Sequence, residues 1–279
     1  MVDEKDPWKG LKYFNVLGET DRKGLWSVAG VTLNNPAISI QKEGYYASCI
    51  RYTLSEKDKM TGRWKPYDRD EETICLRKIV NPIPMYAWNM SLMKYPVRTN
   101  EWVGLDMQRA EWMPPYGNGQ TEDVRFHVWR STNGYDRAHP AEVLTVRFIG
   151  DKNGVCGIND RDISYQSTMK LPYGAPRDGY SETEFRLERQ LIRNDFETKT
   201  NTGTTNCFFR IRSTVDQDGN LVEGLYGKIR GPMAVEGGRG IRIKMLYYVN
   251  PTPNDLNMEF DPKRNLIHKK GVSLAVPLP

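Results

Sequence analysis

The chain has 279 residues, of which 40 are Lys or Arg, 35 are Asp or Glu and 3 are His. Its mean hydropathy of −0.65 is polar for a globular protein, but an aromatic content of 11% excludes a disordered chain. The sequence contains no long Lys/Arg block and no apolar run of about 18 residues, which excludes a basic nucleic-acid-binding arm and a membrane-spanning helix.

Segments of alternating apolar and polar residues dominate the chain. Taken in order, the predicted strands cover residues 44–54, 72–80, 101–109, 123–131, 142–150, 206–214 and 240–249. Asn-Pro, Asn-Gly and Asp-Gly pairs, which favour turns, separate them. Residues 181–192 fit either a helix with a Ser181–Glu184 capping box or a strand, and the alternation of Phe185 and Leu187 favours the strand.

This pattern predicts an all-β protein, a β-sandwich built from jelly-roll-like layers. The polar, turn-rich stretch 159–183 predicts a boundary between an N-terminal domain of residues 1–160 and a C-terminal subdomain of residues 161–279. The alternative is a long crossover loop within one domain. The charged opening MVDEKDPWKG is interpreted as a start Met joined to the mature end of an exported chain whose signal peptide has been removed.

The cysteine pattern argues against a metal site. Cys49, Cys75, Cys156 and Cys207 form no Cys-x-x-Cys pair, and the chain has only three histidines. Cys49 and Cys75 fall within predicted strands, where buried free thiols are expected. A disulfide of unassigned pairing is the alternative.

One short acidic sequence has the spacing of a calcium loop. Asp216, Asp218 and Asn220 in DQDGN alternate as calcium ligands do, but an EF-hand needs a bidentate Glu where this chain has Gly227. An Asp-Gly hairpin turn explains the sequence, so no cofactor is expected and calcium is the weaker alternative. The polar loop NDRD (159–162) is interpreted in the same way.

The segment DVRFHVWRS (123–131) is the most informative about function. In a strand its apolar residues share one face, and the other face carries Arg125, His127 and Trp129. An exposed indole can stack on the apolar face of a sugar ring, and a neighbouring guanidinium can bind hydroxyls or carboxylates. The alternative is that a loop or a second domain covers the indole.

Three further aromatic residues are candidates for the rim of this surface. Trp102 and Trp112 flank the strand 101–109, and Tyr116 lies in the proline-containing loop EWMPPYGNG (111–119). The alternative is a plug that closes one end of the sandwich.

An enzyme on the same scaffold is the main alternative function. A polysaccharide lyase needs a group that neutralises the substrate carboxylate and a His or Tyr base, and Arg125, His127 and Tyr135 are of the right types. Arg210 and Arg212, predicted to share a face of the strand 206–214, are also of the right type. The candidate carboxylates for a glycoside hydrolase are Asp106, Glu111, Glu122 and Asp123. No spacing ties these residues together, so no catalytic residue is assigned and a solvated basic face is the simpler interpretation.

Two stretches carry a resemblance to a known group of proteins. WVGLDMQRAEWMPPYGNGQTEDVRFHV (102–128), and YGKIRG (226–231) together with YYVNPTPNDLNMEFDPKRNLI (247–267), resemble uncharacterised secreted or surface proteins of carbohydrate-degrading bacteria. The resemblance implies an exported, β-rich protein in a polysaccharide context and assigns no catalytic residue. Independently of it, Pro251 and Pro253 predict that the last part of the chain leaves its strand and folds back to cover an edge of the sandwich.

The predicted function is non-catalytic binding of polysaccharide at the cell surface or in the periplasm. The binding face consists of Arg125, His127 and Trp129, with Trp102, Trp112 and Tyr116 as its rim. The alternatives are a polysaccharide lyase or glycoside hydrolase, and a structural or assembly protein. The expected partner is an oligosaccharide or polysaccharide. The mild positive charge of the chain makes acidic glycans candidates as well.

Overall fold

The computed structural model describes residues 16–28, 35–53, 60, 72–96, 100–130, 142–192, 195–236, 241–269 and 276–279. By its internal contacts the chain divides into two compact units, one formed by Met1–Ile38 with Arg51–Glu72 and the other by Ser39–Ile50 with Thr73–Pro279. A two-stranded sheet joins β1 (Ala37–Ile40) and β2 (Ser48–Arg51). All other strands, and the stretch 159–183, belong to the second unit.

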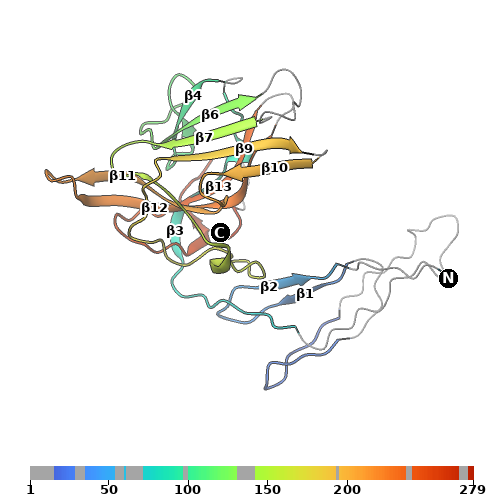
Figure 1. Ribbon diagram of the computed structural model, residues 1–279. Coiled ribbons are helices and arrows are strands. Elements are labelled where there is room, and N and C mark those ends of the chain that lie inside the picture. Colours follow the sequence, from blue (N-terminus) through green and yellow to red (C-terminus); the bar gives the residue numbers. More distant parts are fainter. Residues whose placement is uncertain are drawn as a thin grey trace. The chain divides into compact units, whose positions relative to one another are not determined.

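Two six-stranded sheets build the second unit (Figure 1). Sheet A has the order β10-β9-β7-β6-β4-β5, and sheet B has the order β14-β3-β13-β12-β11-β8. The strands of sheet A are β4 (Trp102–Asp106), β5 (Glu111–Trp112), β6 (Val124–Arg130), β7 (Glu142–Phe148), β9 (Glu184–Ile192) and β10 (Asp195–Thr200). The strands of sheet B are β3 (Ile83–Asn89), β8 (Gly154–Gly157), β11 (Cys207–Val215), β12 (Leu221–Glu236), β13 (Arg242–Val249) and β14 (Phe260–Asn265).

Neighbouring strands are antiparallel, except that β14 runs parallel to β3. Helical structure in the described part of the chain is limited to two 3-10 turns, η1 (Met90–Leu92) and η2 (Asp160–Asp162). No helix among the described residues has the length and apolar character needed to cross a membrane.

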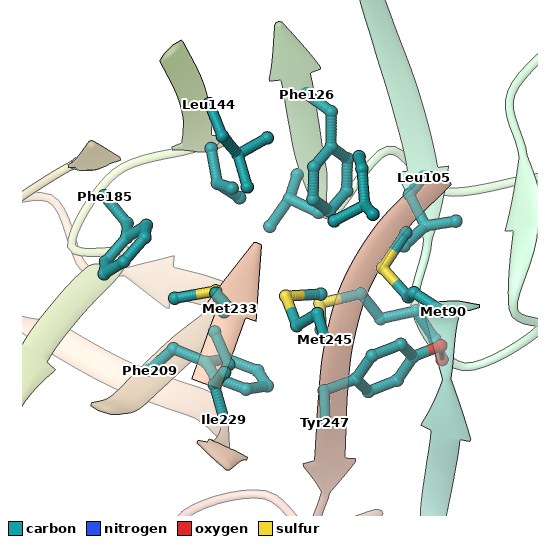
Figure 2. Packing of buried hydrophobic residues seen from close by; sticks show 14 of the residues in the cluster. Met90, Leu105, Phe126, Leu144, Phe185, Phe209, Ile229, Met233, Met245 and Tyr247 are labelled. Atoms are coloured by element: carbon teal, nitrogen blue, oxygen red, sulfur yellow. Dashed lines mark hydrogen bonds between the residues drawn. The ribbon is translucent and has the colours of Figure 1, made fainter. Parts of the chain in front are cut away.

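The main hydrophobic core lies between the two sheets. Figure 2 shows side chains of sheet A, among them Phe126 and Leu144, facing side chains of sheet B such as Phe209 and Met245. Burying each such side chain contributes about 1.5–3 kcal/mol, which fixes the apolar faces of β4, β6, β7 and β9 toward this layer. The prediction of an all-β sandwich is confirmed.

The outer face of sheet B is also buried. A second hydrophobic cluster, which includes Phe208, Tyr226 and Tyr248, packs against residues of the 158–180 loop and against Val276 near the end of the chain. The predicted return of the chain after Pro251 is confirmed, because β14 adds a strand at the edge of the sheet, beside β3. Sheet B is therefore an interior layer, whereas the outer face of sheet A carries exposed side chains such as Trp102 and Trp129.

The predicted strand 72–80 is wrong. The structure has one isolated bridge there, between Lys78 and Tyr45, and Val80 is 69% exposed. The segment alternates apolar and polar residues but has no neighbouring strand to pair with. Arg77 instead donates to the carbonyl oxygens of residues 169–171. Cys75, predicted to be buried, is exposed for this reason.

Cys49 is also exposed, which corrects its predicted burial. It lies in β2, but Ser48 and Ile50 occupy the inward positions of that strand. Cys156 is half-buried, Cys207 is buried, and all four thiols are free. Burial raises the pKa of the Cys207 thiol to about 12, so this thiol is unreactive at neutral pH.

Two ambiguous segments are resolved in favour of the simpler interpretation. Residues 184–192 form β9, with Phe185 and Leu187 in the core, so the strand prediction is confirmed. The sequence DQDGN forms the turn between β11 and β12, where Asp216 accepts from the backbone N–H groups of Asp218 and Asn220. The turn prediction is therefore confirmed as well.

Arg212 joins the two sheets through buried carboxylates. Its guanidinium donates to Asp123 Oδ1 at 2.7 Å and to Asp106 Oδ1 at 3.0 Å, and both aspartates are almost fully buried.

The prediction that Arg210 and Arg212 share a face of their strand is wrong. Arg212 has a φ of 53°, and the register of β11 shifts after Ile211, so this bulge breaks the alternation.

Lys228 is a charged residue enclosed by the covered face of sheet B. It has no exposed surface, and its Nζ donates to the carbonyl oxygen of Pro172 at 3.1 Å. Burial, followed by the nearby charge of Arg77, lowers the pKa of Lys228 well below its usual value, against the opposing effect of Glu259.

We expect Lys228→Met to gain stability relative to the original chain as the pH falls from about 10.5 to about 7. Above this range neither state of the chain carries a proton on the amine. Below it the unfolded chain binds a proton that the folded chain resists, so the original protein loses stability while the variant does not. Urea unfolding at several pH values should show this relative gain, and a pH-independent difference would contradict the expectation.

Candidate functional site

The outer face of sheet A carries the predicted aromatic and basic residues of β6. Val124, Phe126 and Val128 lie in the core and are at most 1% exposed. The alternation of the strand therefore directs Arg125, His127 and Trp129 away from the core. The Trp129 side chain is 36% exposed, and no hydrogen bond or ring contact to it occurs within the described part of the chain. It is the central residue of the candidate site.

A second exposed indole comes from β4. Trp102 pairs with His127 across the strands, their ring centroids are 5.0 Å apart, and Trp102 is 39% exposed. The guanidinium carbon of Arg147, on β7, lies 4.6 Å from the centre of the Trp102 ring, a cation–π distance. The sheet thus presents an aromatic surface on β4 and β6 with an arginine beside it.

Small side chains separate the large ones on this face. Val143 and Thr145 of β7 lie opposite Trp129 and His127 in the register of the sheet. Both are only 6% exposed, because larger side chains of β6 and β9 stand on either side of them. On β7 the outward side chains opposite Trp129 and His127 are therefore small and almost fully buried.

Three arginines on this face are each paired with a glutamate. Arg125 binds Glu122 through two hydrogen bonds of 2.7 and 2.6 Å. The other two pairs join Arg147 to Glu184 at 2.5 Å and Arg186 to Glu188 at 2.8 Å. Exposed pairs of this kind add at most about 1 kcal/mol to stability. In each pair the carboxylate occupies N–H groups of the guanidinium.

Gly104 makes room for one of these pairs. It lies opposite Arg125 on β4, and a Cβ at this position would stand 2.3 Å from Glu122 Oε1. Any larger residue would have to displace the carboxylate that orients Arg125.

His127 is a neutral hydrogen-bonding group at pH 7. Its Nε2 lies 3.3 Å from Asn100 Oδ1. Partial burial, followed by the positive charge of Arg186, lowers the pKa of His127 below 6.5. The folded protein therefore disfavours the imidazolium, and stability associated with neutral His127 is lost as the pH falls below the unfolded value.

We expect an NMR titration to give His127 a pKa below 6.5, and Arg186→Gln to raise it by removing the nearby charge. A His127 pKa above 6.5 in the original protein, or one that Arg186→Gln leaves unchanged, would contradict this assignment of cause.

Trp112, predicted as a rim residue, does not lie on this face. It is 6% exposed, and its indole N–H donates to the carbonyl oxygen of Lys94. Its ring meets Tyr95 and Phe126 edge-on in the core. Of the two interpretations of the aromatic loop, the structural one holds for this residue.

Tyr116 is exposed but is held at the border of the sheet. Its hydroxyl donates to Glu101 Oε2 at 3.0 Å, one residue before β4 begins, and its side chain is 40% exposed. Among the described residues, Tyr116 makes no hydrogen bond or ring contact with Trp102 or Trp129. Tyr135 lies outside the described residues.

The carboxylates considered for hydrolysis have structural partners. Asp106 and Asp123 both bind Arg212 and are 1% and 2% exposed. Glu111 binds Lys269, and Glu122 binds Arg125. In the described part of the chain, no three His, Cys, Asp or Glu side chains are grouped as a metal site requires.

Sequence reasoning missed Arg147, Arg186 and their glutamate partners. Each alternates outward in its own strand, so the segments 142–150 and 181–192 contained the signal. Their place beside His127 and Trp102 follows only from the pairing of β7 with β6 and β9, which the sequence does not reveal.

No protein-family model matches the chain, and neither a curated protein nor a solved structure is significantly similar to it.

Proposed function

We propose that the outer face of sheet A binds polysaccharide without catalysis, at the cell surface or in the periplasm. The observation that carries the proposal is that two indoles, Trp102 and Trp129, are more than one-third exposed on the same face of adjacent strands. Large exposed apolar rings are costly in water, and a sugar ring offers an apolar face of matching shape.

The polar groups around the indoles support this ligand class. Arg125, Arg147 and His127 border the aromatic surface and supply donors and acceptors in fixed positions. Sugar hydroxyls both donate and accept hydrogen bonds, so each can pair with an oriented guanidinium or carboxylate. Apolar stacking together with a few directed polar contacts is the usual composition of a small-molecule site.

Electrophoresis in native gels that contain single polysaccharides tests the proposal. At least one polymer should retard the protein, and Trp102→Ala/Trp129→Ala should abolish the retardation. Tyr165→Ala is the matched control, because Tyr165 is 60% exposed but lies on the loop that covers sheet B. The proposal fails if no polymer retards the protein or if the double variant is retarded as strongly as the original.

A further inference from the structure

Four cation–carboxylate pairs lie on the outer face of sheet A among the residues that the structure describes. Among the described side chains, the cations that face outward on β6, β7, β9 and β10 are Arg125, Arg147, Arg186 and Lys199. Each has a carboxylate within 3.7 Å, supplied by Glu122, Glu184, Glu188 and Glu197 respectively. Four cations face four carboxylates, so these pairs carry no net charge.

This balance is not a property of the whole chain. The protein has 40 basic and 35 acidic residues, a net charge of +5. The five unmatched positive charges therefore lie outside these pairs. His127 stands between Trp102 and Arg186 without adding a further positive charge at neutral pH.

An acidic sugar would have to compete for guanidinium groups that are already bound. Arg125 uses both Nε and one Nη in its bidentate pair with Glu122. A second carboxylate or a sulfate would meet the charge of Glu122 next to its target, and like charges at such distances repel. A neutral hydroxyl meets no such repulsion and can use the remaining N–H groups of the arginine and the free lone pairs of the glutamate.

We propose that the ligand is a neutral polysaccharide and that the glutamates of these pairs select against acidic ones. The inference rests on the proposed function, since it names the ligand class of that same face. It also reverses the expectation, drawn from net charge, that acidic glycans are suitable partners.

A comparison of one polymer backbone in neutral and charged form tests the inference. The full chain is run in native gels containing hydroxyethyl cellulose or carboxymethyl cellulose, and in parallel gels containing dextran or dextran sulfate. Two further neutral polymers, galactomannan and mixed-linkage β-glucan, complete the set.

The neutral form that binds should do so at least about tenfold more tightly than its charged derivative, with little change up to about 0.15 M salt. Preference for the charged derivative, weakened by salt, would overturn the inference and leave the proposed function standing. Failure of every polymer to bind would overturn both.

Glu184→Gln and Glu188→Gln provide a second readout on the same gels. Each releases an arginine from its partner, so retardation by carboxymethyl cellulose or dextran sulfate should increase severalfold. Glu43→Gln is the control, because Glu43 is exposed in the turn between β1 and β2, away from these pairs in the sequence. Unchanged retardation by the charged polymers in both variants would contradict the selecting role of the glutamates.

Discussion

Trp129→Ala is expected to weaken polysaccharide binding by roughly 5- to 150-fold, which corresponds to about 1–3 kcal/mol. Trp129 is the exposed indole of β6. The outward residues Val143 and Thr145 on the neighbouring strand are too small and too buried to take over stacking on a sugar ring. Isothermal titration with an oligosaccharide of the polymer that binds would measure the change directly.

A conservative variant separates loss of the ring from loss of the fold. Trp129→Phe should retain a substantial part of the affinity because a smaller ring still stacks. Both variants should unfold within about 1 kcal/mol of the original protein, since an outward, partly exposed side chain contributes little to the core. Binding that is unchanged in Trp129→Ala would contradict the role given to this indole.

Arg212→Met is expected to lower the free energy of unfolding by about 3–5 kcal/mol. The substitution leaves two carboxylates, Asp106 and Asp123, buried without the cation that binds both. The matched control is Arg109→Met. Arg109 also approaches Asp106, at 3.7 Å, but its side chain is 51% exposed, so we expect a loss below about 1 kcal/mol.

The pH dependence of the Arg212 variant provides an independent check. Burial raises the pKa of Asp123, and the hydrogen bonds from Arg212 oppose this effect. Without Arg212 the carboxyl should titrate at a still higher pH, so protonation on acidification removes the buried charge. The stability deficit of Arg212→Met should therefore shrink as the pH falls from neutral, and a deficit that is small at pH 7 or grows in acid would contradict this account.

The faces of individual strands follow from the sequence because alternation is a local property. In β4 and β6 every second side chain is apolar, and the burial of Val103, Phe126 and Val128 fixes Trp102 and Trp129 outward. The same local logic fails where a strand lacks partners, as for residues 72–80, or where a bulge interrupts it, as at Arg212.

The composition of the site depends on long-range pairing and could not be predicted. Arg147 and Arg186 reach the aromatic surface through the register of β7 and β9. Trp112 lies in a two-residue strand, and Gly117 folds back so closely that a Cβ there would stand 2.4 Å from the Trp112 carbonyl oxygen. The loop therefore turns back tightly beside the buried indole of Trp112. The aromatic content of the segment alone does not show whether such an indole is buried or lies at the rim of an open surface.

The most direct test of the account is to follow the indole N–H signals of the tryptophans by NMR during titration with a binding oligosaccharide. Trp→Phe variants assign each signal, and the buried residues Trp88 and Trp112 serve as internal controls. The account predicts that the signals of Trp102 and Trp129 shift with saturation while those of Trp88 and Trp112 stay in place. Saturable binding that leaves Trp102 and Trp129 unshifted would contradict the proposal that this face of sheet A is the binding surface.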